Sequence, residues 1–296
     1  MKITITGASG FVGTNLINYL QKGNEILPLS LRFDLGNKLY FNSNAIIHLA
    51  GKAHDLKQAK NPDEYYKVNL ELTKQVFDSF VDSDAEIFIF MSSVKASADS
   101  IKEMLNEDIK PNPQSHYGKS KLLAENYILS KELPEGKRVF IIRPCMIHGP
   151  GNKGNLNLLY KLVIKGFPWP LGAFQNQRSF CSIENLCYVL SEILENDKIP
   201  SGIYNIADDE TLSTNELIQL IANTTNKKAR ILAISKKLIF MLARLGDILR
   251  LPLNTESLDK LTENFVVSNK KIKKALHIKS LPISSKEGMV KTFNTF

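Results

Sequence analysis

The chain has 296 residues, 43% of them hydrophobic and 23% charged, which is ordinary for a soluble globular protein of one large domain or two domains that share a core. Its three cysteines (Cys145, Cys181 and Cys187) are too few and too irregularly spaced for a disulfide framework, and they fit a reducing cytoplasm. The formal net charge of +8 suits an anionic partner, but the sequence carries no metal-ligand spacing and no nucleic-acid-binding signature, so an anionic small molecule is favoured over nucleic acid.

Short apolar runs recur along the chain, each rich in β-branched or aromatic residues. Continuous runs of this kind are typical of strands that are buried on both faces of a parallel sheet. Stretches with helical spacing separate them, and this alternation predicts a doubly wound α/β (Rossmann) sheet. The predicted strands are residues 2–7, 24–31, 44–51, 86–93, 138–144 and 202–207.

Two of the intervening segments show a clear helical repeat. Val12, Leu16 and Leu20 recur on one face of residues 11–23, and apolar residues recur every four positions in residues 66–81. Only twelve residues, 32–43, separate the second and third predicted strands, which is near the lower limit for a crossover with its own helix. We therefore expect a minimal turn or 3₁₀ piece there.

The pattern divides the chain into two units. Residues 1–150 with about 180–207 form the predicted dinucleotide-binding domain, and about 151–179 with 208–296 form a smaller, mainly helical substrate-binding subdomain. The first glycine turn comes after only five strand residues, which leaves no room for a signal peptide.

A late apolar run, "LIFMLARLGDILRL" at 238–251, is too short and too charged to span a membrane. An amphipathic helix of this kind suits either a membrane surface or packing against its own domain, and packing is the preferred interpretation.

A phosphate-binding turn is predicted at "TGASGFVG", which follows the first strand and opens the first helix. Gly7, Gly10 and Gly13 allow a sharp turn, a close approach of backbone N–H groups to a pyrophosphate, and tight packing of helix on sheet. The end of the second strand offers Arg32 and then Asp34. An arginine there suits the 2′-phosphate of NADP, whereas an acidic residue suits the ribose of NAD, so NADP is slightly favoured and NAD stays open.

Tyr117 and Lys121 lie four residues apart in "SHYGKSKLLAE", and therefore share one face of a helix. A nearby ammonium lowers the pKa of a phenol, which allows the tyrosine to exchange a proton with a sugar hydroxyl or ketone. Ser92 and Ser93 end the fourth predicted strand, where ligands of doubly wound sheets bind. Lys119 is interpreted as solvated.

Five motifs carry a resemblance to the extended short-chain dehydrogenase/reductases, the NAD(P)-dependent enzymes of the epimerase/dehydratase family that act on nucleotide sugars. They run in the family's order over residues 1 to about 210. The motifs are "TGASGFVG", "HLAG", "MSSVKA", "YGKSKLLAE" and "RPCMIHGPG".

The resemblance implies roles for particular residues. Tyr117 is the implied acid/base, Lys121 its partner, and Ser93 rather than Ser92 the third member of the catalytic set. His48 is interpreted as structural, and His148, which stands where the family commonly has a tyrosine, is interpreted as an ordinary loop histidine with a catalytic role as the alternative. The implied cofactor contacts are Gly7, Gly10, Phe11, Val12, Gly13, Arg32, Asp34, Leu35, Leu49, Ala50, Gly51, Asn69, Ser92, Tyr117, Lys121, Pro144 and Met146.

The implied substrate contacts lie on both predicted units. Arg178 resembles the arginine that binds the substrate diphosphate, a task suited to a planar guanidinium, although an ordinary ion pair would also explain it. Ser93, Lys95, Asn155 and Leu156 complete this set. The resemblance also suggests a nucleotide-diphosphate sugar as partner, with UDP favoured, and a homodimer.

The sequence departs from the related 4,6-dehydratases at one informative place. Those enzymes carry an Asp-Glu pair after the catalytic hydroxyl, and this chain has Val94 and Lys95. A dehydratase is therefore disfavoured. A UDP-4-keto-6-deoxy-N-acetylhexosamine 4-reductase for surface polysaccharide synthesis is the preferred function, a 4-epimerase with tightly bound NAD is the alternative, and a non-catalytic dinucleotide-binding protein is the third.

Overall fold

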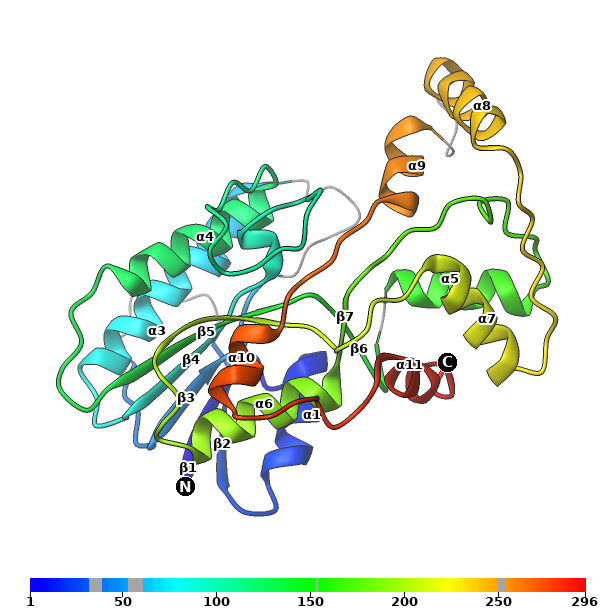
Figure 1. Ribbon diagram of the computed structural model, residues 1–296. Coiled ribbons are helices and arrows are strands. Elements are labelled where there is room, and N and C mark those ends of the chain that lie inside the picture. Colours follow the sequence, from blue (N-terminus) through cyan, green and yellow to red (C-terminus); the bar gives the residue numbers. More distant parts are fainter. Residues whose placement is uncertain (32–38, 53–60, 153, 250–253) are drawn as a thin grey trace.

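The computed structural model describes residues 1–31, 39–52, 61–152, 154–249 and 254–296. Its centre is a six-stranded sheet in which every neighbouring pair is parallel, in the order β2-β1-β3-β4-β5-β8 (Figure 1). The strands are β1 (Lys2–Thr6), β2 (Glu25–Leu29), β3 (Ala45–His48), β4 (Ile87–Met91), β5 (Arg138–Pro144) and β8 (Gly202–Ile206).

All six predicted strands are confirmed, and so is the doubly wound class. The chain leaves β1 toward the edge strand β2 and then returns past β1 to β3, so the direction of winding reverses between β1 and β3. Ligands of such sheets bind in the crevice at the carboxyl ends of the strands at this point. The expected minimal turn after β2 falls largely on residues 32–38, which lie outside the described part of the chain.

Helices cover both faces of the sheet because residues of each strand alternate between two apolar clusters. In β4, Ile87 and Ile89 pack into one cluster, whereas Phe88 and Phe90 pack into the other. The first face is covered by α1 (Phe11–Leu20), α6 (Ile183–Glu195) and α10 (Lys270–Ala275), and the second by α3 (Leu72–Val81) and α4 (His116–Leu129).

The predicted helix at 66–81 is interrupted by a change of helix type. It comprises α2 (Asp63–Tyr66), a π-helical turn at Lys67–Glu71, and α3. Val68, Leu72, Val76 and Phe80 are buried, as their spacing predicts. Single π-helical turns inside α-helices are frequent at functional sites, and this one contains Asn69.

A third apolar cluster lies beyond the sheet, to its right in Figure 1. It unites Leu156, Trp169, Leu217 and Phe293, which come from widely separated segments of the chain. The elements of this region are the short parallel pair β6 (Met146–His148) and β7 (Phe180–Ser182), with α5 (Asn155–Ile164), α7 (Thr214–Thr224), α8 (Lys236–Leu249), α9 (Thr255–Thr262) and α11 (Ser285–Phe293).

The late apolar run forms most of α8, and only part of it packs against its own domain as the preferred interpretation expects. Ile239 and Ala243 are buried in the third cluster, but most of the large apolar side chains of α8 remain in solvent. Ile248 is 78% exposed and Met241 60% exposed. None of the helices within the described residues has the length and continuous apolarity that a bilayer-spanning segment needs.

Candidate active site

The glycine turn between β1 and α1 is packed too tightly for side chains. Gly7 has φ +69°, and a Cβ there would lie 2.7 Å from the backbone nitrogen of Ala50 and 2.8 Å from the carbonyl carbon of Leu49. A Cβ on Gly13 would lie 2.5 Å from the carbonyl oxygen of Gly7. Gly10 is the N-cap of α1, and no side chain within the described residues caps this helix start. The N-terminus of α1 therefore fits a diphosphate, because its positive end and its backbone remain approachable.

Replacing Gly13 by alanine tests this close packing. We expect Gly13→Ala to lower the free energy of unfolding by about 1–3 kcal/mol, since the new methyl group meets backbone atoms that cannot move aside, and to weaken cofactor binding. Gly23→Ala is the matched control, because a Cβ at Gly23 meets nothing within 4 Å. Urea unfolding and a dinucleotide titration measure both effects, and equal behaviour of the two variants would contradict the packing argument.

The structure brings Tyr117 and Ser93 together at the carboxyl end of β4. Tyr117 lies in the first turn of α4, and Ser93 is the N-cap of a 3₁₀ turn at Val94–Ala96. A hydrogen bond joins the two hydroxyl groups. Burial raises the pKa of the Tyr117 phenol, the hydrogen bond to Ser93 opposes this rise, and the nearby Tyr65 adds to it. In the absence of ligands the phenol is therefore protonated at neutral pH.

Lys121 is buried one turn further along α4. Its ammonium donates a hydrogen bond to the carbonyl oxygen of Met91 at 2.8 Å and lies 4.8 Å from the centre of the Phe90 ring. Burial lowers the pKa of Lys121 to about 8, and the charge of Glu125 opposes this shift. A Cβ on the exposed Gly51 would lie 3.2 Å from Nζ of Lys121, so this ammonium faces the loop after β3.

Asn69 connects that loop to α4. Its Nδ2 donates to the backbone oxygen of Lys52 and to the hydroxyl of Ser120, both at 3.1 Å, and its Oδ1 accepts from the backbone N–H of Lys52 at 2.8 Å. The π-helical turn places this fully buried side chain between the two elements. Asn69 therefore fixes the position of the Gly51 loop relative to the Lys121 ammonium.

A buried polar network lies next to the site, and the sequence analysis did not identify it. Glu125 and Arg143 form an ion pair in which both side chains are almost fully buried. Ser92 donates to Glu125, and Arg143 donates to the hydroxyl of Ser97 at 2.6 Å. The hydroxyl of Ser92 is thus used by this network, whereas the hydroxyl of Ser93 contacts Tyr117. Glu125 follows Lys121 by one helical turn, a spacing that could have indicated the network.

Asp99 holds the start of α4. It accepts hydrogen bonds from the backbone N–H groups of Gln114 and Ser115 and from the Ser115 hydroxyl, at 2.6, 2.9 and 2.6 Å. These hydrogen bonds outweigh burial and lower the pKa of Asp99, so it stays ionised. A carboxylate is stabilised at a helix N-terminus, and here it fixes the turn that carries Tyr117.

Lys95 and Arg178 lie on either side of the segment that follows α9. Nζ of Lys95 donates to the carbonyl oxygen of Asp99 at 2.5 Å and lies 4.6 Å from the centre of the Phe265 ring. Arg178 donates to the carbonyl oxygen of Lys260 at 3.2 Å, and its Nη2 lies 3.8 Å from Oε1 of Glu263. Desolvation lowers the pKa of both cations. Arg178 thus makes the ordinary ion pair that was the alternative to its predicted substrate contact, and this pair leaves much of the guanidinium's donor capacity available.

The remaining predicted residues are placed as follows. Pro144 is buried and ends β5, Met146 begins β6 and is partly buried, Asn155 begins α5, and Leu156 is buried in the third cluster. Phe11 and Val12 are partly buried at the start of α1. Arg32, Asp34 and Leu35 lie outside the described residues.

The two histidines considered above are both fully buried. His48 contacts the hydroxyls of Thr6 and Thr73 at 2.7 and 3.0 Å. His148 contacts Thr292 at 2.9 Å and Asp208 at 3.3 Å. Both are held by partners in the protein interior, which fits the structural interpretation of His48, whereas His148 lies in β6 rather than in the expected loop.

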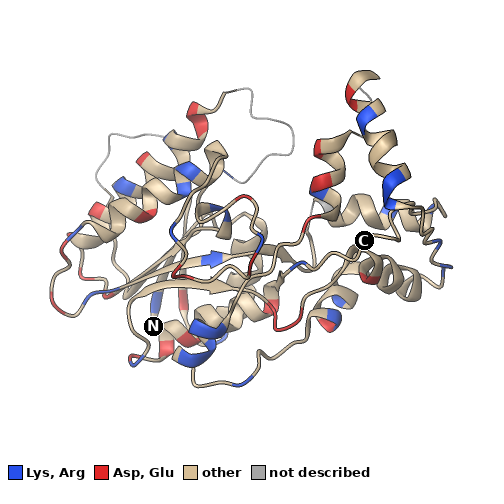
Figure 2. Cartoon of the chain, turned by 45° about the horizontal axis from the view of Figure 1, so that its top comes forward, with Lys and Arg blue, Asp and Glu red and all other residues tan. Residues whose placement is uncertain are grey.

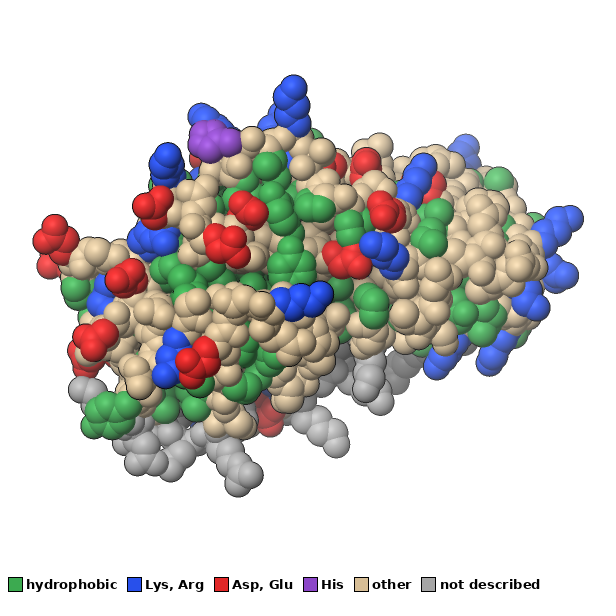
Figure 3. All heavy atoms as spheres, turned by 90° about the horizontal axis from the view of Figure 1, so that it is seen from below, with side chains coloured by type: hydrophobic (Ala, Val, Ile, Leu, Met, Phe, Trp, Pro, Cys, Tyr) green, Lys and Arg blue, Asp and Glu red, His purple; other side chains and the backbone are tan. Residues whose placement is uncertain are grey.

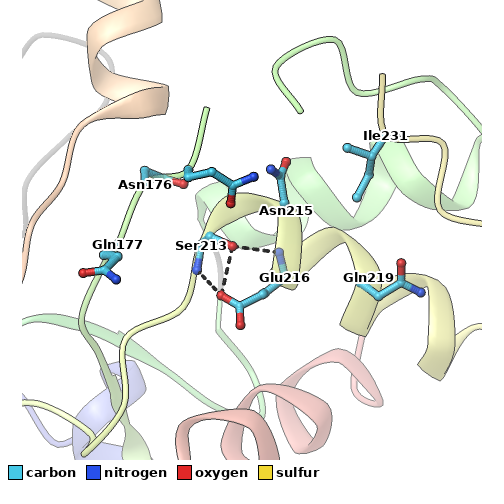
Figure 4. Close-up of a pocket in the computed structure, with 8 residues that line it drawn as sticks. Asn176, Gln177, Ser213, Asn215, Glu216, Gln219 and Ile231 are labelled. Carbon is cyan, nitrogen blue, oxygen red and sulfur yellow. Dashed lines mark hydrogen bonds between the residues drawn. The ribbon is translucent and has the colours of Figure 1, made fainter. Parts of the chain in front are cut away.

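A polar pocket of about 500 Å³ opens beside the N-terminus of α7 (Figure 4). Asn176, Gln177, Asn215 and Gln219 are among its lining residues, and Glu216 is held there by a reciprocal hydrogen-bond cap with Ser213. None of the residues discussed for proton transfer lines it. It lies next to Arg178 in the chain, within the region of the third cluster.

The sheet order, the glycine turn at β1 and the crevice beside it define a dinucleotide-binding α/β protein. The model of the NAD dependent epimerase/dehydratase family matches residues 3–207, and the chain belongs to this family. It is thus an enzyme of the extended short-chain dehydrogenase/reductases and uses NAD or NADP.

Similar proteins include 4-epimerases and reductases of nucleotide sugars. A UDP-glucose 4-epimerase of Vibrio cholerae is 31% identical over 249 residues, which cover 76% of this chain and 76% of that protein. A GDP-6-deoxy-D-mannose reductase of Pseudomonas aeruginosa is 26% identical over 242 residues, which cover 75% and 79%. The chain therefore belongs among the nucleotide-sugar 4-epimerases and reductases.

The fold is also shared with solved structures. A UDP-glucuronic acid 4-epimerase from Bacillus cereus in complex with NAD superimposes with a TM-score of 0.77 at 20% identity, covering 100% of this chain and 98% of that one. At this level of identity the likeness establishes the architecture alone.

Proposed function

We propose that this chain transfers a hydride to C4 of a nucleotide-diphosphate sugar, and that it acts as a reductase of a UDP-4-keto-6-deoxy-N-acetylhexosamine. The observation that carries the proposal is the placement of Tyr117 in the first turn of α4, beside Ser93 and one helical turn from the buried side chain of Lys121. Val94 and Lys95 provide no carboxyl group for an elimination at the sugar, which argues against dehydration.

The proposed residues divide the work at the ketone. Bound nicotinamide supplies the hydride. Tyr117 donates its proton to the O4 oxygen as charge develops there, and Ser93 donates a hydrogen bond to the same oxygen. Lys121, one helical turn further along α4, is proposed to stabilise the phenolate that remains. The start of α1 and the loop at Leu49, Ala50 and Gly51 are proposed to hold the dinucleotide.

We further propose that the region of the third cluster binds the nucleotide sugar, and that residues 1–150 with about 180–207 form the dinucleotide-binding domain. Lys95 and Arg178 supply two cations near the boundary between this region and the dinucleotide-binding domain. A pair of cations suits the binding of a diphosphate. Glu263 partly offsets the charge of Arg178 in the free protein. A homodimer is proposed from the family resemblance alone.

A 4-epimerase is the second candidate, and the 31% identity to the Vibrio cholerae UDP-glucose 4-epimerase favours it. The same three side chains would then act in both directions on one sugar, with the hydride returned to the opposite face of C4. The two functions differ in their use of the cofactor. A reductase consumes it, whereas an epimerase regenerates it.

Product analysis separates the candidates. We expect the purified protein to oxidise about one NADPH for each UDP-4-keto-6-deoxy-GlcNAc that it converts, in line with a single hydride step. Interconversion of UDP-GlcNAc and UDP-GalNAc without added cofactor would instead identify the epimerase. If the protein converted neither substrate, both candidate functions would be contradicted.

The rate should depend on pH through Lys121. The Lys121 side chain is protonated below its pKa of about 8 and neutral above it. We therefore expect turnover to fall as pH rises through about 8. Stability should move the opposite way. The unfolded-state pKa is near 10.5, so the folded state binds fewer protons between about pH 8 and 10.5, and unfolding becomes less favourable over this range. A turnover that still rises at pH 10 would contradict the role of Lys121.

A further inference from the structure

The exposed face of α8 is a continuous apolar stripe. Leu238, Leu242, Leu245 and Leu249 recur at spacings of four, three and four residues, and each is at least 43% exposed. This spacing places them on one side of the helix, and Met241 and Ile248 flank them. Figure 1 shows α8 at the end of the molecule remote from the sheet, where α9 is its neighbour. The stripe is thus a second apolar face, distinct from the one that packs Ile239 and Ala243 inward.

The residues around this stripe are strongly cationic. Residues 227–250 contain seven Lys and Arg and a single acidic residue, Asp247. Asp247 accepts hydrogen bonds from the backbone N–H and the hydroxyl of Thr255 at 3.0 and 2.9 Å, so it is turned toward α9. At 100° per residue, Lys237 and Arg244 fall beside Ile248 at the border of the stripe.

The positive charge extends over the surrounding region. Residues 151–179 and 208–296 together contain 19 Lys and Arg against nine Asp and Glu, which is a formal net charge of +10. The rest of the chain carries 19 Lys and Arg against 21 Asp and Glu. In Figure 2 the ribbon of α8 is blue at its Lys and Arg positions, and Figure 3 shows several Lys and Arg side chains at the end of the molecule remote from the sheet. The apolar stripe therefore lies in the cationic part of the protein.

We propose that α8 docks on the anionic surface of a lipid bilayer, with its leucine stripe in the headgroup region and its cations against lipid phosphates. The helix has 14 residues, too few to span a membrane, but it has two features of an interfacial helix: an exposed apolar face and lysine and arginine at its border. A second copy of this chain is a poorer occupant, because a two-fold interface would bring the same cations face to face. The proposal goes beyond the proposed function and does not depend on which sugar is reduced.

Sedimentation of the full chain with vesicles tests the proposal. We expect binding to vesicles of phosphatidylcholine with phosphatidylglycerol, weaker binding at high salt, and little binding to phosphatidylcholine alone. Lys237→Gln with Arg244→Gln should weaken binding about thirtyfold, because two cations are removed from the contact. Leu245→Gln with Ile248→Gln should weaken it about tenfold or more through the apolar face.

Leu129→Gln is the matched control, because Leu129 is a similarly exposed leucine, 54% accessible at the end of α4. It should bind vesicles as the parent protein does. All variants should unfold at the same urea concentration as the parent protein, which shows that they are folded. Vesicle binding that survives both double substitutions would overturn the proposal. So would a fall in solution mass caused by the leucine and isoleucine substitutions, since that result would assign the stripe to contact between copies.

Discussion

Tyr117→Phe is expected to lower kcat by about 10²–10⁴-fold, the range that a positioned general acid contributes. The variant keeps the ring against Tyr65 and removes only the hydroxyl that meets Ser93. Dinucleotide binding should be unchanged, because the glycine turn and Lys121 are intact. Stopped-flow NADPH oxidation together with a binding titration would measure the two properties separately.

Tyr127→Phe provides the matched control on the same helix. Its hydroxyl donates to both carboxylate oxygens of Asp78 at 2.7 Å, away from Ser93. We expect it to retain nearly full kcat, with at most a small loss of stability. If the Tyr117 and Tyr127 variants turned over equally fast, Tyr117 would not be the proton donor.

Arg143→Met is expected to lower the free energy of unfolding by about 3–5 kcal/mol, because it leaves the Glu125 carboxylate buried without its counter-ion. Arg143 also donates to Ser97, so that hydroxyl loses a partner as well. Chemical denaturation with a two-state fit would measure the change. We expect a loss of activity too, since Glu125 lies one turn from Lys121 on α4.

The double variant Arg143→Met with Glu125→Leu isolates the cause. Replacing both members of a buried ion pair by apolar residues is often neutral or stabilising, so most of the lost stability should return. Recovery of stability without recovery of activity would show that the pair positions Lys121 and Ser92 rather than holding the fold together. A double variant as unstable as the single one would contradict the assignment of the penalty to an unpaired charge.

Much of the fold was predictable because the strands are buried on both faces. Such strands have no polar alternation and stand out as short apolar runs, as at Ile87–Met91. The glycine turn was predictable as well. Close backbone contacts at such a turn exclude side chains, so glycines recur at a fixed spacing directly after the strand. The local spacing of Tyr117 and Lys121 indicated that both face the same side of α4.

Other features depend on contacts between distant segments. Glu125 and Arg143 lie 18 positions apart on different elements, and neither looks unusual alone. Lys95 and Arg178, which are far apart in sequence, both contact the segment at Phe265. The π-helical turn at Asn69 could not be predicted either, because it leaves the apolar repeat of residues 66–81 unchanged. For α8, hydrophobic periodicity predicted the helix but could not tell which apolar residues would be buried by the rest of the chain.

Transfer of a labelled hydride tests the central claim most directly. The purified protein is incubated with UDP-4-keto-6-deoxy-GlcNAc and NADPH deuterated at C4 of the nicotinamide, and the product is analysed by mass spectrometry and NMR. The proposed chemistry predicts one deuterium in each product sugar, located at C4, and its loss with Tyr117→Phe. A reduced sugar without deuterium at C4, or unchanged labelling rates in the Tyr117 variant, would contradict it.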